Sequence, residues 1–126
     1  MLAIIQVRTS SKRFPKKALY KVNSIPIIIR VLNNVSKSKL VTKVIIATSK
    51  EKSDDILTKL VKQFKYKFFR GSLNNVALRM LQAAKYNKAR YFIRINGDSP
   101  LIDYKIIDYA IKTFVKHKNV DLVTNV

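Results

Sequence analysis

Three clusters of polar residues in this sequence could contribute to chemistry. The first covers residues 8–17 (R-T-S-S-K-R-F-P-K-K) and contains two arginines, three lysines and three hydroxyl side chains. Such a loop suits a polyphosphate, whose charge is best met by several cations together with hydroxyl and backbone donors. It is neither a Walker loop nor a dinucleotide fingerprint, because it contains no glycine. The spacing alone also allows a solvated basic loop without a ligand.

The other two clusters also follow apolar segments. Residues 94–103 (R-I-N-G-D-S-P-L-I-D) end an apolar run with a glycine and two aspartates. A carboxylate at a strand end can hold Mg²⁺ against a nucleotide phosphate, because this ion prefers carboxylate and water oxygens. We favour this interpretation for Asp98, with an Asx turn as its alternative, and a helix cap for Asp103. Residues 70–79 (R-G-S-L-N-N-V-A-L-R) could form only a turn and a helix cap.

The segments between these clusters have patterns that predict regular structure. Strands are expected at residues 2–7, 43–47, 67–69, 91–95 and 120–123. Helices are expected at residues 27–35, after a cap at Ser53, after a cap at Asn74 or Asn75, and at residues 106–115. Three of the strands are apolar without alternation, which indicates a parallel sheet covered by helices on both faces. We therefore predict one α/β domain spanning residues 1–126.

The expected sheet would bring the three clusters together. Each cluster directly follows a strand, and ligands of parallel sheets bind at the carboxyl ends of the strands, where loops and helix starts supply backbone donors. We therefore predict the functional site at that edge. His117 is expected on the surface. The aromatic residues are expected in the core rather than in a base-stacking surface: Phe64, Phe68, Phe69, Tyr91 and Phe92.

The charge of the chain narrows the class of ligand. Its 126 residues include 26 basic and 7 acidic side chains, a formal net charge of +19, which can indicate nucleic acid, an anionic membrane or a polyphosphate ligand. The lysines are spread along the chain, as on a solvated surface. Because the guanidinium fork binds phosphate bidentately, arginines at loop positions favour a specific anion. Five of the seven arginines lie at or beside expected strand ends or helix starts: Arg8, Arg13, Arg70, Arg79 and Arg94.

Several classes of function are excluded or disfavoured by what the sequence lacks. It has no cysteine and one histidine, which excludes a disulfide framework and thiolate or multi-histidine metal sites. It shows no helix-turn-helix, RNP-like or zinc-finger pattern, so a nucleic-acid partner is disfavoured. No apolar run approaches the ~20 residues of a membrane span, and the N-terminus lacks the signal-peptide pattern. We therefore expect a cytoplasmic protein with no membrane partner.

Four segments, taken in order, resemble one known family. They are Q-V-R-T-S-S-K-R-F-P-K-K at 6–17, I-A-T-S at 46–49, F-R-G-S with Val76 and Arg79 following, and R-I-N-G-D-S-P-L-I-D at 94–103. The family patterns are Q-A-R-x-x-S-x-R-L-P-G-K, V-A-T-S, F-R-G-S-x-x-D-V-L-x-R and R-x-T-G-D-C-P-L-I-D. This order resembles the cytidylyltransferases of the spore coat polysaccharide biosynthesis protein F type, relatives of acylneuraminate and 3-deoxy-manno-octulosonate cytidylyltransferases.

The resemblance implies a Rossmann-like fold of the nucleotide-diphospho-sugar transferase type and a reaction of CTP. A sugar hydroxyl would attack the α-phosphorus of CTP to give a CMP-sugar and pyrophosphate, in the biosynthesis of a surface polysaccharide or glycan. Asp98 would bind the catalytic Mg²⁺, and Arg13 and Lys17 would join it as catalytic residues. The positions that match the family's triphosphate contacts are Arg8, Ser11, Arg13 and Lys17. Those that match its nucleotide pocket are Arg70, Gly71, Arg79 and Arg94.

The sequence also departs from the family pattern. Lys16 replaces the loop glycine and would lose its freedom to adopt positive φ, while Asn75 replaces an aspartate, Asn96 a threonine and Ser99 a cysteine. The resemblance covers only the N-terminal half of the family's chains, whose second half carries acceptor-sugar contacts, dimerisation elements and a further metal-binding acid. A second chain or a homodimer would supply these parts. The alternatives are a non-catalytic nucleotide-binding half-enzyme and a basic nucleic-acid-binding protein.

Overall fold

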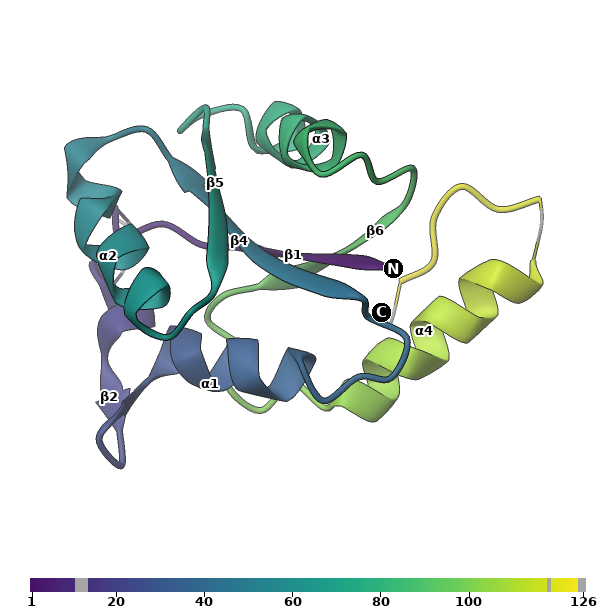
Figure 1. The fold of residues 1–126 in the computed structure, drawn as a ribbon, viewed down its shortest axis with the longest axis horizontal. Coiled ribbons are helices and arrows are strands. Elements are labelled where there is room, and N and C mark those ends of the chain that lie inside the picture. Colours follow the sequence, from purple (N-terminus) through teal and green to yellow (C-terminus); the bar gives the residue numbers. More distant parts are fainter. Residues whose placement is uncertain (11–13, 118, 125–126) are drawn as a thin grey trace.

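A four-stranded parallel sheet forms the centre of the molecule (Figure 1). The computed structural model describes residues 1–10, 14–117 and 119–124. The strands are β1 (Leu2–Gln6), β4 (Lys43–Ser49), β5 (Lys67–Gly71) and β6 (Phe92–Asn96), in the order β5-β4-β1-β6. At the end of β1, Gln6 pairs in register with Ala47 on one side and with Asn96 on the other. The parallel sheet predicted from the non-alternating apolar segments is thereby confirmed.

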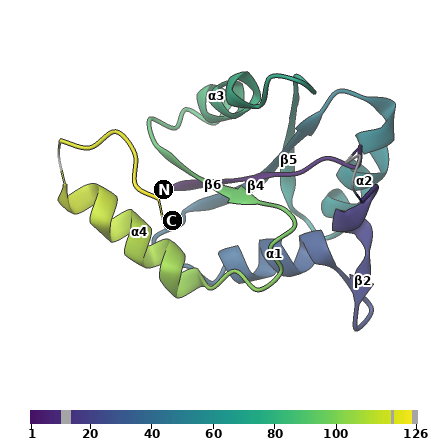
Figure 2. The same ribbon diagram turned by 180° about the vertical axis from the view of Figure 1, so that it is seen from behind.

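Helices cover both faces of this sheet, as the sequence predicts (Figures 1 and 2). One face carries α1 (Ile27–Val35), α2 (Asp55–Gln63) and α4 (Tyr104–Lys116), and the other carries α3 (Val76–Tyr86). Shorter elements are the 3-10 turns η1 (Lys17–Leu19) and η2 (Lys52–Asp54) and a hairpin of β2 (Lys21–Val22) and β3 (Ile25–Pro26). Within the described chain, no helix is both long enough and apolar enough to cross a membrane.

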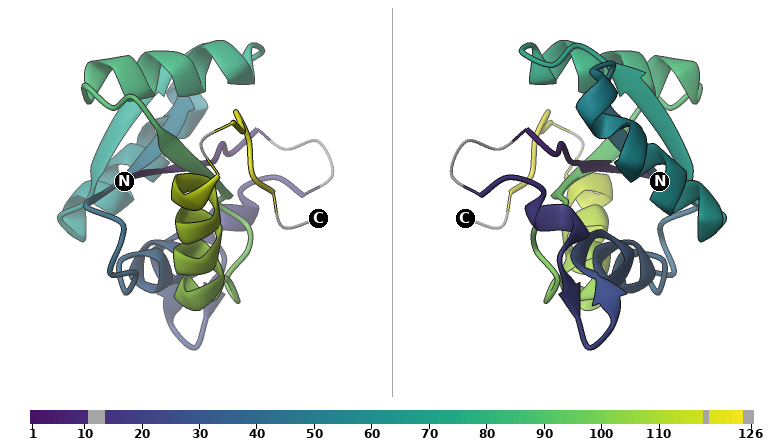
Figure 3. Two further views of the ribbon diagram at one scale, coloured as in Figure 1. Left: turned by 90° about the vertical axis from the view of Figure 1, so that its right-hand side faces the viewer. Right: turned by 90° about the vertical axis from the view of Figure 1, so that its left-hand side faces the viewer.

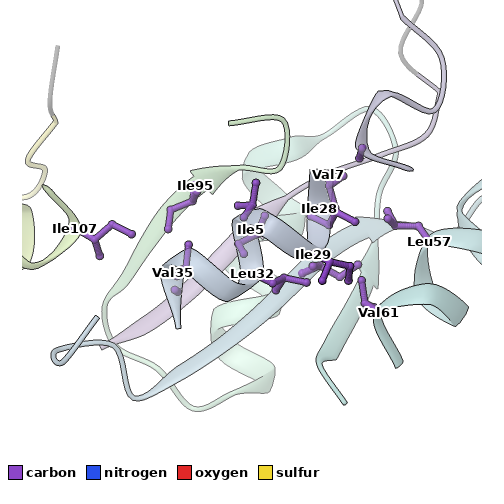
Figure 4. Packing of buried hydrophobic residues seen from close by; sticks show 14 of the residues in the cluster. Ile5, Val7, Ile28, Ile29, Leu32, Val35, Leu57, Val61, Ile95 and Ile107 are labelled. Carbon is purple, nitrogen blue, oxygen red and sulfur yellow. The ribbon is translucent and has the colours of Figure 1, made fainter. Parts of the chain in front are cut away.

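The strand pleat divides the buried side chains into two cores. Alternate residues of a strand point to opposite faces, so Ile5 and Val7 pack with the face formed by α1, α2 and α4 (Figure 4). Ile4 packs instead with Met80 and Ala83 of α3. Because each of these positions is buried on one face or the other, the central strand is apolar throughout rather than alternating.

The expected fifth strand at residues 120–123 is wrong. Residues 119–124 form no strand or helix, and the segment turns back from the end of α4 toward the sheet (Figures 1 and 3). It lines, with β6 and α4, a largely apolar cavity of about 780 Å³. Leu122, in the middle of this segment, is 78% exposed. Within the described residues, β6 therefore remains an edge strand.

The prediction that the aromatic residues form the core is also wrong in part. Phe64, Phe68 and Tyr91 are exposed, whereas Phe69 and Phe92 pack partly buried against the α3 core. The reason is position, since β5 and β6 are the two edge strands and Phe64 follows the end of α2. His117 is exposed at the end of α4, which confirms its expected surface position.

Two of the expected helix caps are confirmed. Asn75 precedes α3 and accepts a hydrogen bond from the backbone N–H of Leu78 at 2.8 Å. Asp103 precedes α4 and accepts one from the N–H of Lys105, also at 2.8 Å. These bonds satisfy donors that have no partner within the first helical turn. Asn75, which stands where the family has an aspartate, is therefore a sufficient cap for α3.

Candidate functional site

The carboxyl ends of β1 and β6 bring the first and third polar clusters into contact. Lys17 Nζ lies 3.1 Å from Asp98 Oδ2, although the two residues are 81 positions apart in the chain. The chain order of the strands reverses between β1 and β6, and open α/β sheets bind ligands beside such reversal points. The predicted meeting of these clusters at one sheet edge is confirmed.

The loop after β1 is closed by its own backbone. Lys16 adopts the left-handed conformation, with φ 58° and ψ 17°, and its N–H donates to the carbonyl of Thr9 at 2.9 Å. The expectation that a lysine would give up the positive-φ backbone of the family glycine is therefore wrong. The lysine keeps that conformation at a cost of about 1–2 kcal/mol. Ser11 and Arg13, predicted to contact the triphosphate, lie outside the described residues.

The backbones of the first and third clusters also touch directly. Gly97 follows β6, and its N–H donates to the carbonyl of Gln6 at 2.8 Å. A Cβ atom at Gly97 would lie 2.7 Å from the Cβ of Val7, closer than any real side chain allows. Glycine is thus required for the loop that carries Asp98 to pack against the loop that carries Lys17.

A buried carboxylate links the ends of β1 and β4. Asp54 is fully buried, and we call the group formed by Thr9, Thr48, Ser49 and Asp54 the Asp54 junction. Its carboxylate accepts five hydrogen bonds, from Thr9 N (2.8 Å), Thr9 Oγ1 (2.6 Å), Thr48 Oγ1 (2.7 Å), Ser49 N (3.0 Å) and Ser49 Oγ (2.5 Å). Burial raises the pKa of Asp54, but the hydrogen bonds from Ser49, Thr9 and Thr48 outweigh it and lower the pKa to about 2.

Sequence reasoning missed this junction. It assigned the helix cap to Ser53, but the residue that precedes α2 is Asp54, whose side chain makes no capping hydrogen bond and turns into the protein instead. The available signal was the pair Thr48-Ser49 at a strand end, which offers several donors, followed shortly by an acid. A carboxylate that accepts two or three hydrogen bonds can remain charged while buried.

A buried arginine lies on the opposite side of the same edge. Arg79 of α3 is fully buried, and its Nη1 donates to the carbonyls of Ser72 at 2.6 Å and Leu73 at 3.3 Å. Its Nε and Nη2 atoms are also buried and have no hydrogen-bond partner among the described residues. Such unpaired buried donors are costly and need an explanation.

The charges of Arg8 and Arg94 act on this arginine, and Gln6 lies on the same face of the sheet, two residues after Ile4. We call Gln6, Arg8, Arg79 and Arg94 the Arg79 cluster. Burial lowers the pKa of Arg79, as do the charges of Arg8 and Arg94, while the charge of Asp54 raises it. Gln6 adds a buried carboxamide oxygen without a partner among the described residues. The cluster therefore places the charges of Arg8 and Arg94 near a buried guanidinium with unused donors, with an unused acceptor on the same face of the sheet.

Gly71 lets α3 approach the sheet at this point. A Cβ atom at Gly71 would lie 2.9 Å from the Cγ of Arg79, so a larger residue would displace the arginine stem. Among the predicted nucleotide-pocket residues, the structure thus brings Gly71 and Arg94 close to Arg79. The role of Gly71 here is to leave space for the arginine side chain.

Arg70 is directed elsewhere. Its Nη1 pairs with Asp55 Oδ1 at 2.6 Å, its Nε donates to the carbonyl of Ser49 at 2.9 Å, and its Nη2 donates to the carbonyl of Glu51 at 2.8 Å. It thereby fastens β5 to the loop between β4 and α2. The structure does not bring it to the Lys17–Asp98 pair, and a role for Arg70 in nucleotide binding stays a prediction.

Asp98 suits a magnesium ion that a phosphate also holds. Its side chain is 52% exposed at the carboxyl edge, and the described residues contain no group of three or more acids or histidines that could hold a metal by themselves. Magnesium is commonly bound through one or two carboxylates together with substrate phosphates and water. The donor set therefore fits Mg²⁺ when a phosphate ligand completes it.

The fold is that of an open parallel α/β domain with a group of cationic side chains at the carboxyl ends of its strands. The family model for cytidylyltransferases matches residues 2–126. The chain belongs to the cytidylyltransferase family, and the resemblance found in its motifs is confirmed.

Relatives of known name agree with this assignment. The chain is 32% identical over 116 residues to the spore coat polysaccharide biosynthesis protein SpsF of Bacillus subtilis, covering 89% of this chain and 48% of the relative. It is 30% identical over 124 residues to the 3-deoxy-manno-octulosonate cytidylyltransferase of Geobacter sulfurreducens, covering 97% and 48%. The solved structure of a cytidylyltransferase from Leptospira borgpetersenii serovar Hardjo-bovis superposes with a TM-score of 0.87 and 32% identity, covering 93% and 49%. The chain spans about half the length of the curated relatives it matches.

Proposed function

We propose that this chain binds CTP with Mg²⁺ at the carboxyl edge of its sheet, as the nucleotide-binding half of a sugar cytidylyltransferase. The observation that carries this proposal is the Arg79 cluster. A buried guanidinium with two unused donors, repelled by Arg8 and Arg94, is stabilised when an anionic or acceptor-rich ligand arrives. Perturbed and unpaired groups of this kind gather at functional sites.

The basic loop and Asp98 would receive the triphosphate. Arg8 and Lys17 lie at the two described ends of this loop, and Ser11 and Arg13 belong to the same loop. Mg²⁺ held by Asp98 and the phosphates would supply charge neutralisation for the departing pyrophosphate. Lys17, which pairs with Asp98 at 3.1 Å, would move its ammonium group to a phosphate oxygen when the nucleotide binds.

The reaction proposed for the complete enzyme is transfer of CMP. The oxygen of a sugar hydroxyl forms a bond to the α-phosphorus of CTP, the bond from that phosphorus to the α,β-bridging oxygen breaks, and pyrophosphate leaves. The residues of this chain would act by positioning and by electrostatic stabilisation rather than by covalent chemistry. The product would serve a surface polysaccharide or glycan, since the named relatives include SpsF and a 3-deoxy-manno-octulosonate cytidylyltransferase.

We propose that turnover by the complete enzyme also requires acceptor-sugar contacts beyond the nucleotide site described above. The relatives are about twice as long, since the chain covers 48% of SpsF, and we propose that a second chain or a second copy supplies the sugar contacts. A non-catalytic nucleotide-binding half-enzyme is the alternative. The cytoplasmic location expected from the sequence stays a prediction.

A thermal melt with each of the four nucleoside triphosphates and Mg²⁺, at low and moderate salt, tests the proposal. A ligand that binds only the folded protein raises the midpoint, by about 2.7 kcal/mol of stabilisation at a hundredfold excess over its dissociation constant. CTP should give the largest rise, and Asp98→Ala should remove the part that depends on Mg²⁺. Asp121→Ala, which removes an exposed acid of the C-terminal segment, is the matched control and should leave the rise unchanged.

A different pattern of midpoint shifts would contradict the proposal. An equal rise with every nucleotide and with pyrophosphate would reduce the site to a basic surface and remove the case for CTP. Polynucleotide binding that falls steeply with salt and does not compete with CTP would then favour the nucleic-acid-binding alternative.

A further inference from the structure

The reaction proposed above leaves one buried acid at the carboxyl edge without a role. Asp54 is 0% exposed, and among the described residues no cation forms an ion pair with it. The hydrogen bonds to its carboxylate come from uncharged groups, namely two backbone N–H groups and three hydroxyl groups. Isolated buried charges are expensive, so a site built to keep this carboxylate charged calls for a physical reason.

The two oxygens of the carboxylate serve two different segments. Oδ1 accepts both bonds from Thr9, in the loop after β1, whereas Oδ2 accepts the bonds from Thr48 and Ser49 at the end of β4. Thr9 Oγ1 also lies 2.9 Å from the carbonyl of Ser53. Asp54 therefore connects the start of the basic loop to the buried carboxyl end of β4.

A short series of contacts leads from Asp54 to the proposed phosphate and metal site. The N–H of Thr9 donates to Asp54, and the carbonyl of Thr9 accepts the N–H of Lys16 at 2.9 Å. Lys17 follows immediately and pairs with Asp98. Arg8 precedes Thr9 in the chain. Both described ends of the basic loop are thus fixed, directly or through one hydrogen bond, by the same carboxylate.

We propose that Asp54 is a positioning residue that holds the two described ends of the loop after β1, so that Arg8 and Lys17 are placed against the phosphates of the nucleotide. This rests on the function proposed above. An acceptor with two oxygens is required, because each oxygen accepts a backbone N–H group, from Thr9 on Oδ1 and from Ser49 on Oδ2, and such a group can only donate. An asparagine would turn an NH₂ group toward some of these donors and release one of the two segments.

The division between the two oxygens provides a matched pair of variants. Thr9→Val removes a hydroxyl donor from Oδ1 on the loop side, and Thr48→Val removes one from Oδ2 on the strand side. Both threonines are buried, at 3% and 0% exposed, and valine has nearly the same shape. The two variants should therefore cost similar stability but differ in their effect on the loop.

The experiment is calorimetric titration of CTP and of CMP, each with Mg²⁺, into the wild type and the variants. CMP lacks the β- and γ-phosphates, so it reports on the folded site without most of the loop contacts. Asp54→Asn and Thr9→Val should weaken CTP binding about tenfold or more and leave CMP within about twofold, while Thr48→Val should leave both within about twofold. Asp108→Asn is the control and should leave CTP and CMP binding unchanged. It also removes a hydrogen-bonded carboxylate, but one that accepts from Ser38, which precedes β4.

Each outcome decides a different question. If the wild type binds neither nucleotide, the proposed function fails and the role of Asp54 fails with it. If the wild type binds CTP and the two threonine variants weaken it equally, or if CMP binding falls as much as CTP binding, Asp54 is only a structural residue and the positioning role is overturned. Should Asp54→Asn not fold, the threonine pair decides, because both variants keep the carboxylate in place.

Discussion

The Asp54 junction and the Arg79 cluster are two buried charges at the same edge of one sheet, and their surroundings differ completely. Both side chains are 0% exposed. The carboxylate accepts five hydrogen bonds, whereas two of the guanidinium nitrogens have no partner among the described residues. A charge whose bonds are complete belongs to the framework. A charge whose bonds are incomplete indicates where a ligand is expected.

The two regions also influence each other. The charge of Asp54 raises the pKa of Arg79, in opposition to burial, Arg8 and Arg94, which lower it. The acid therefore helps to keep the guanidinium charged in a crowded cationic environment. The Asp54 junction therefore supports the Arg79 cluster in two ways. Asp54 binds the backbone of Thr9, which follows Arg8, and its negative charge acts on Arg79.

The largest effect on stability should come from removing the carboxylate of Asp54. Asp54→Ala leaves several buried donors without an acceptor, at about 1–3 kcal/mol for each unsatisfied group, so it should lower the free energy of unfolding by about 3–5 kcal/mol. Urea denaturation at neutral pH measures this. Asp98→Ala removes an exposed acid and should change the same quantity by less than about 1 kcal/mol. Equal losses in the two variants would contradict the framework role of the junction.

Acid should weaken the junction over a defined pH range. The folded-state pKa of Asp54 is about 2 and lies below its ordinary value of 3.8, so its contribution is complete above about pH 5 and is lost as the pH falls toward 2. The contribution amounts to about 2.5 kcal/mol. The hydrogen bond from Ser38 also lowers the pKa of Asp108, so the comparison needs variants. Urea denaturation between pH 2 and 7 should show a smaller loss in Asp54→Asn than in Asp108→Asn.

Removing Arg79 should have the opposite effect, with little change in stability and a large loss of affinity for CTP. Arg79→Met removes a buried cation with unpaired donors, so the free energy of unfolding without ligand should change by no more than about 1 kcal/mol. Affinity for CTP should fall about tenfold or more, because charged hydrogen bonds contribute about 1.5–3 kcal/mol each. Arg90→Met removes an exposed arginine that lies over Tyr91 and should not affect CTP binding. A large loss of stability with unchanged affinity would make Arg79 a framework residue.

The sequence predicts the strands and loops that carry this site better than the buried contacts within it. Non-alternating apolar strands require a parallel sheet, and a parallel sheet places the loops that follow its strands at one edge, so the contact of Lys17 with Asp98 could be expected. The burial of Asp54 could not, because an acid before a helix is normally a cap, and Thr9, which supplies both donors to one of its oxygens, is 45 positions away in the chain. The exposed aromatic residues were missed for the same reason, since the sequence does not show which strands lie at the sheet edges.

Substitutions of Lys16 should give the smallest change in stability, and they test the backbone of the loop alone. Its left-handed backbone, with φ 58°, closes the loop that Asp54 holds, and a non-glycine residue there costs about 1–2 kcal/mol. Lys16→Gly should therefore raise the free energy of unfolding, by about 0.5–1 kcal/mol after the greater entropy of glycine in the unfolded chain is subtracted. Thermal or urea unfolding of the ligand-free protein measures the gain.

Lys16→Ala separates backbone strain from charge. Alanine removes the same cation from a chain of net charge +19 but keeps a Cβ atom, so the strain remains and no comparable gain is expected. If alanine stabilised the protein as much as glycine, relief of repulsion between cations would be the cause. If only glycine does so, the gain comes from relief of backbone strain at Lys16, and the protein keeps a lysine there at a cost in stability.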